Sequence, residues 1–221
     1  MRPHTGFLVT ALCPALLTAA ADAGLLPVLR ASLYRGASTR AILCIDFGIV
    51  LAASIVGWFL ARRGSFPVWW REQETSAAPR QLVLGLLLAV VVVVGNTLIW
   101  FAARGRIAEL APWVGLITPP TAILLACRGA LTENVVFRFF LFPLVSLAVI
   151  RGGCPQPATL VLGALVSSAA FALIHPGLMV AFLAGLALVY LYCRYGLLAA
   201  LVVQFVGDAV PFVLLSHSPR A

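Results

Sequence analysis

The chain has 221 residues, of which 62% are hydrophobic and only 10% are charged. Its mean hydropathy is +1.07, and its apolar fraction lies far above the roughly 45–50% that is typical of soluble domains. These values exclude an ordinary soluble protein and indicate an integral membrane protein whose length fits one polytopic domain.

Charge and cysteine usage exclude several kinds of partner. Fifteen arginines and no lysines stand against seven acidic residues, and most of the arginines lie in short connections between apolar runs. That distribution is typical of membrane flanks and not of a surface that binds nucleic acid. The five cysteines are odd in number and show no CxxC spacing. We therefore expect no nucleic-acid partner, no disulfide framework and no structural zinc.

Seven apolar segments follow one another along the chain. The expected spans are, approximately, residues 7–29, 41–61, 82–103, 121–150, 157–175, 178–193 and 196–215. Since a bilayer-spanning helix needs about 20 apolar residues, we predict an all-α fold, a polytopic transmembrane bundle of about seven spanning helices. The arginines between the spans divide almost evenly between the two sides, so the positive-inside rule leaves the orientation open.

The first segment has two interpretations. Arg2 precedes a short apolar run and "TAAADA" offers small residues, as in a cleaved signal peptide. Apolar residues continue through Leu29, however, which favours a retained helix.

The fourth segment departs from a simple span. The prolines of "TPP" predict a helix that starts at Thr121. Residues 121–150 are too many for a perpendicular crossing, so we expect part of this helix to project from the hydrocarbon core or to line a cavity.

Charged and imidazole side chains inside these apolar segments need a physical reason. A charge at bilayer depth costs at least about 2.5–3.5 kcal/mol on insertion scales, so each requires a partner or a water-filled cavity. The residues in question are Asp22, Asp46, Arg128, Glu133, Arg138, His175 and Asp208. Spacings of four residues put Asn134 with Arg138, Phe171 with His175, and Gln204 with Asp208 on shared helix faces.

The order of these residues suggests hydrolysis by water. A carboxylate can deprotonate a water, an imidazole can share that proton, and amide donors can stabilise an oxyanion. Glu133, His175 and the pair Gln204 and Asp208 each belong to a different predicted helix, so a bundle could bring them together. The alternative for these polar residues is a purely structural role, in a network of interhelical hydrogen bonds and ion pairs.

Three motifs resemble those of a known family. "ENVVFR", "FALIH" and "QFVGD" are similar to EExxxR, FxxxH and HxxxN or HxxxD of the CAAX-protease and bacteriocin-processing family of glutamic intramembrane proteases. The resemblance covers about residues 121–215, which implies a catalytic core there and leaves residues 1–120 as additional transmembrane helices of the same membrane domain. It implies that Glu133 activates the hydrolytic water together with His175.

The resemblance assigns the remaining site residues. It implies that Gln204 and Asp208 hold the oxyanion or order the site, and that Asn134, Arg138 and Phe171 give structural support. No cofactor and no metal are implied. The partners would be the lipid bilayer and a membrane protein, lipidated peptide, or leader or sorting peptide as substrate.

Two residues depart from the family pattern. Asn134 replaces the second glutamate, so Arg138 loses the carboxylate one turn before it, and we hypothesise that Asp46 or Asp22 supplies the counter-charge. Gln204 replaces a histidine, and an amide can donate a hydrogen bond but cannot carry a proton. We therefore expect reduced activity, which Gln204→His should raise.

The leading hypothesis is an intramembrane endopeptidase in the plasma membrane of a bacterium. One alternative is a catalytically degenerate family member that acts as a membrane binding or scaffold protein. A weaker alternative is a proton-coupled transporter that uses the same acids.

Overall fold

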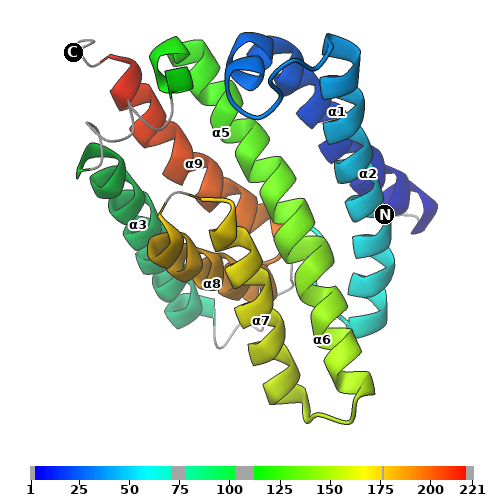
Figure 1. Ribbon diagram of the computed structural model, residues 1–221. Helices are drawn as coiled ribbons and strands as arrows, with labels where there is room; N and C mark the ends of the chain where they lie inside the picture. Colours follow the sequence, from blue (N-terminus) through cyan, green and yellow to red (C-terminus); the bar gives the residue numbers. More distant parts are fainter. Residues whose placement is uncertain (1–2, 71–77, 103–111, 176, 218–221) are drawn as a thin grey trace.

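The computed structural model describes residues 3–70, 78–102, 112–175 and 177–217, which form helices joined by short connections and contain no strand (Figure 1). The all-α prediction is confirmed. The elements are α1 (Pro3–Ala31), α2 (Thr39–Gly64), α3 (Ala78–Ala102), the 3₁₀ helix η1 (Pro112–Leu116), α5 (Pro119–Glu133), the π-helix η2 (Asn134–Leu141), α6 (Phe142–Arg151), α7 (Gln156–Leu173), α8 (Leu178–Tyr195) and α9 (Leu197–Ser216).

Seven helical segments in the described ranges are long and apolar enough to cross a membrane, which confirms a multi-pass protein. One of them runs without a break through α5, η2 and α6, from Pro119 to Arg151. At roughly 1.5 Å per residue its 33 residues extend for about 50 Å. This helix is therefore longer than a hydrocarbon core of about 30 Å, as its sequence predicted.

The start of α5 differs slightly from the prediction. The helix begins at Pro119 instead of Thr121, because both prolines occupy the first two helical positions, where a missing N–H costs no hydrogen bond. Thr118 is the N-cap: its side chain accepts from the backbone N–H of Thr121, and its own N–H donates to the Thr121 hydroxyl over 2.7 Å. This capping box fixes where the long helix begins.

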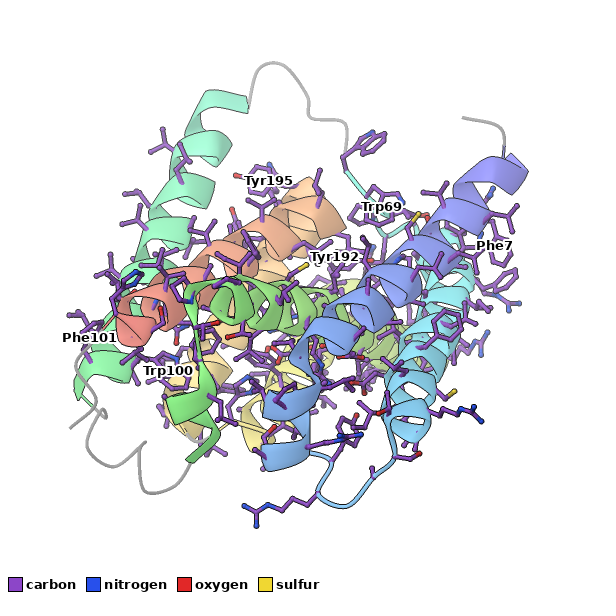
Figure 2. All side chains as sticks on the ribbon, turned by 90° about the horizontal axis from the view of Figure 1, so that it is seen from above. Phe7, Trp69, Trp100, Phe101, Tyr192 and Tyr195 are labelled. Atoms are coloured by element: carbon purple, nitrogen blue, oxygen red, sulfur yellow. The ribbon has the colours of Figure 1, made fainter. Side chains whose placement is uncertain are left out.

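The long helix lies at the centre of the bundle. Helix α1 packs against α2 and α5, α9 packs against α5 and α3, and α7 packs against α6 and α8 (Figure 1). The largest apolar cluster includes Phe139, Phe142 and Tyr192, whose side chains are fully buried; Tyr192 is labelled in Figure 2. Helix α3 is the least buried span and stacks Trp100 edge-on against Phe212 of α9.

Backbone hydrogen bonds from the α2–α3 connection position the start of α9. The N–H groups of Leu197 and Leu198 donate to the carbonyls of Val68 and Trp69 over 3.1 and 3.0 Å. Trp69 in turn donates its indole N–H to the hydroxyl of Thr10 on α1 over 2.8 Å (Figure 2). The first helix is thus linked to the helix that carries Gln204.

A buried ion cluster joins the N-terminal helices to α5. Arg128 donates to Asp22 of α1 over 2.7 Å and also to Asp46 of α2. Tyr34, between α1 and α2, donates its hydroxyl to Asp46. Burial and this hydrogen bond to Asp46 raise the pKa of Tyr34 to about 12, so it remains a neutral donor at physiological pH. Because Asp22 belongs to α1, this helix is part of the bundle.

Arg128→Leu is expected to lower the free energy of unfolding by about 3–5 kcal/mol, because it leaves two buried carboxylates without their cation. Thermal unfolding of the purified protein in detergent measures the effect. Arg151→Leu, at the exposed end of α6, is the matched control and should change the midpoint little. Equal midpoints for the two variants would contradict a stabilising role for the cluster.

Candidate active site

The first motif lies where the long helix changes its hydrogen-bonding pattern. Glu133 is the last residue of α5, and residues 134–141 form the π-helix η2. The backbone N–H of Phe142 still donates five residues back, to Phe137. Gly57 of α2 permits a close approach here, since a Cβ at that position would come within 2.7 Å of the Phe139 carbonyl. Single π-turns inside α-helices are frequent at functional sites.

Glu133 and His175 face each other. The Nε2 atom of His175 lies 3.7 Å from Oε1 of Glu133. The Nδ1 atom of His175 lies 2.8 Å from the carbonyl oxygen of Phe171. Since a carbonyl only accepts, Nδ1 carries the proton, and in the neutral ring Nε2 presents a lone pair toward Glu133. Two acceptors therefore point at the same small space.

Gln204 contacts the other oxygen of Glu133. Its Nε2 donates to Oε2 of Glu133, while its Oε1 accepts from Nδ2 of Asn134 over 2.8 Å. Nδ2 of Asn134 also donates to the carbonyl of Ala130 over 2.9 Å. Gln204 and Asn134 are 4% and 0% exposed. These side chains form one connected network across α5, η2 and α9.

Asp208 also faces Glu133. A Cβ built on Gly129 would lie 3.6 Å from Oδ2 of Asp208 and 3.7 Å from Oε1 of Glu133, so both carboxylates border the space above this glycine. Asn96 of α3 donates to Oδ1 of Asp208 over 3.0 Å and to the carbonyl of Gly207 over 2.8 Å. Asp208 and Gln204 share a helix face, as predicted, and the Gln204 amide is also a hydrogen-bonding neighbour of the Asp208 carboxylate.

Arg138 is buried against the second motif. The guanidinium carbon lies 4.0 Å from the centroid of the Phe171 ring, and that ring lies 4.3 Å from the imidazole of His175. Arg138 is only 1% exposed, and its Nη1 donates to the backbone carbonyl of Glu133 over 3.5 Å. The ring of Phe171 thus contacts both Arg138 and His175.

Two expectations about Arg138 are wrong. Asp22 and Asp46 do not neutralise it, because both bind Arg128, ten residues earlier on the same long helix. Asn134 does not bond it either, because the Oδ1 atom of Asn134, which could accept from the guanidinium, has no hydrogen-bond partner in the described part of the chain. The expected facing of Asn134 and Arg138 assumed an α-helix, and the π-helix changes which side chains share a face. Nη2 of Arg138 has no hydrogen-bond partner among the described residues.

The site combines buried support with reachable reactive groups. The side chains of His175 and Glu133 are 30% and 20% exposed, whereas Asn134, Arg138 and Gln204 are buried. The first two side chains are reachable from outside the bundle, and the other three are buried beside them. In the described ranges, no group of three or more His, Cys, Asp or Glu residues lies close enough to hold a metal ion.

Sequence reasoning missed Asn96. It lies inside the apolar run of α3, in the part of the chain without a motif, yet its amide contacts Asp208. The signal was present in the sequence, since Asn96 is an isolated amide in a segment of valine and leucine. A polar side chain in such a segment is expected to find a partner within the bundle.

Comparison with known proteins finds a family match for part of the chain. Residues 115–210 match the family model described as "Type II CAAX prenyl endopeptidase Rce1-like". No curated protein and no solved structure matches the chain. The matched segment contains all three motifs, and α1, α2 and α3 lie outside it. The resemblance to the CAAX-protease family is thereby confirmed over residues 115–210.

Proposed function

We propose that this protein is an intramembrane endopeptidase of the bacterial plasma membrane in which Glu133 and His175 activate water. The observation that carries the proposal is the separation of 3.7 Å between Oε1 of Glu133 and Nε2 of His175. Two acceptors at that separation repel each other unless a donor lies beside both. A water molecule has two O–H groups and can donate one to each.

Such a water would be activated by this arrangement. As its oxygen attacks the scissile carbonyl carbon, Oε1 of Glu133 takes one proton, and the neutral ring of His175 accepts a hydrogen bond from the remaining O–H. The proton on Glu133 then passes to the leaving amide nitrogen, and the C–N bond breaks. General base catalysis of this kind contributes about 10²–10⁴-fold to a rate.

Gln204 supplies an oxyanion donor. Its NH₂ group has two N–H bonds, and only one is needed for the hydrogen bond to Oε2 of Glu133. The second can donate to the oxyanion of the tetrahedral intermediate. Asp208, held by Asn96, orients the groups around this position. Neither role requires Gln204 to carry a proton, so its departure from histidine is compatible with activity.

The family description supports a substrate of the prenylated CAAX type. The site lies inside the bundle, so the scissile bond must come from a peptide associated with the bilayer. Leader and sorting peptides share this property and are the other substrates that we propose to test.

Glu133→Gln and His175→Ala are each expected to lower kcat by about 10²–10⁴-fold, because each removes one of the two acceptors that activate water. The assay follows release of the C-terminal tripeptide from a farnesylated CAAX peptide by mass spectrometry, with the full-length protein in proteoliposomes. His217→Ala is the matched control, because the Nδ1 of His217 also lies 2.8 Å from a carbonyl four residues earlier, at the exposed end of α9. It should retain activity within about twofold.

Wild-type activity in Glu133→Gln would reject the role of Glu133 as base. Binding of the peptide without hydrolysis by the wild-type protein would favour a non-catalytic membrane binding protein.

Phe171→Ala is expected to lower kcat at least about tenfold with a smaller change in KM, because the imidazole loses the ring that holds it. Phe140→Ala is the control for lost packing, since Phe140 packs on the apolar cluster around Val50 and Val135, away from His175. Both changes should lower the unfolding midpoint, but only Phe171→Ala should lower kcat. Equal kcat values for the two variants would contradict a positioning role of Phe171.

A further inference from the structure

The two amides of the site form a hydrogen-bonded chain with a defined direction. Nδ2 of Asn134 has two hydrogens, and they point to the carbonyl of Ala130 and to Oε1 of Gln204. Nε2 of Gln204 then donates to Oε2 of Glu133. Both amide side chains are more than nine-tenths buried. Both hydrogens of the Asn134 amide and one hydrogen of the Gln204 amide thus meet an acceptor. The chain of hydrogen bonds runs from the backbone of α5 to the carboxylate of Glu133.

Asn134 fixes which end of the Gln204 amide faces Glu133. If the amide of Asn134 turned over, its oxygen would face the two oxygens that now accept from it, so its orientation is determined. Its N–H group in turn attracts Oε1 of Gln204, which leaves the NH₂ group of Gln204 on the side of Glu133. A carboxylate can only accept, so in this orientation both N–H groups of Asn134 and one N–H group of Gln204 meet acceptors, while Oδ1 of Asn134 has no hydrogen-bond partner among the described residues.

We propose that Asn134 is a positioning residue that acts on Glu133 through Gln204. It holds the Gln204 amide so that one N–H binds Oε2 of Glu133 and the other is available to an oxyanion. With Oε2 engaged, Oε1 remains directed at His175. This inference rests on the proposed peptidase function for its kinetic consequence, whereas the hydrogen-bond chain itself can be tested through stability.

The donor pattern predicts how two substitutions interact. Asn134→Asp replaces the donor by a second acceptor, so Oε1 of Gln204 is repelled and its amide must turn its oxygen toward Glu133. Gln204→His introduces a ring that, when protonated, carries an N–H on both nitrogens and can donate to two carboxylates at once. The backbone N–H of residue 134 already donates to the carbonyl of Ala130, so that oxygen stays paired. Gln204→His should therefore rescue Asn134→Asp.

The test is a double-mutant cycle of Asn134→Asp and Gln204→His in the full-length protein, with kcat and KM measured on the farnesylated peptide. With Gln204 present, Asn134→Asp should lower kcat about 100-fold and change KM less than about threefold. In the Gln204→His background the same change should lower kcat less than about fivefold. Asn134→Ala removes the donor without adding an acceptor and should cost about tenfold.

Thermal unfolding of the same four proteins in detergent separates this inference from the proposed function. Asn134→Asp should lower the midpoint when Gln204 is present and leave it nearly unchanged after Gln204→His. The role of Asn134 would be overturned if Asn134→Asp lowered kcat equally with Gln204 and with Gln204→His. If the wild-type protein is inactive, equal losses in the unfolding midpoint would overturn it. If the wild-type protein cleaves nothing and the midpoints still show the rescue, the peptidase proposal fails and the hydrogen-bond chain stands.

Discussion

Polar groups inside an apolar bundle must find their partners in the bundle, because the hydrocarbon around it offers none. In this protein the long helix from Pro119 to Arg151 carries two sets of such groups. Arg128 binds carboxylates on α1 and α2, and Glu133, five residues later, accepts from Gln204 of α9. The rotation of this one helix therefore determines both sets of contacts together.

This arrangement gives the N-terminal helices a physical connection to the core. Helices α1 and α2 lie outside the family match, yet they hold the first half of α5 through Asp22 and Asp46. Helix α3 reaches the site directly, because Asn96 donates to Asp208. The matched segment contains Glu133, His175, Gln204 and Asp208, and the preceding helices contact it through Asp22, Asp46 and Asn96.

The π-helix explains why the side chains of the first motif face other partners than an α-helical wheel predicts. Arg138 lies against Phe171 and the Glu133 carbonyl, while Asn134 faces Gln204. The positive charge is thus stacked on a ring instead of paired with a carboxylate, an arrangement that a desolvated guanidinium tolerates through cation–π attraction. The neutral amide of Gln204 donates to the Glu133 carboxylate and so orients it without adding a charge.

The sequence by itself determined the number of spans, the all-α class and the residues for which we propose a chemical role. Hydropathy depends on composition along the chain, and Glu133 or His175 stands out against apolar neighbours wherever the helices pack. Only the tertiary structure decided which partner each polar residue meets. Asp22 and Asp46 bind Arg128 and not Arg138, and Asn96 joins the site from a helix without a motif. Spacing defines the residues that share a helix face, but the rotation of each helix and the local change from α to π geometry select the side chain that lies opposite.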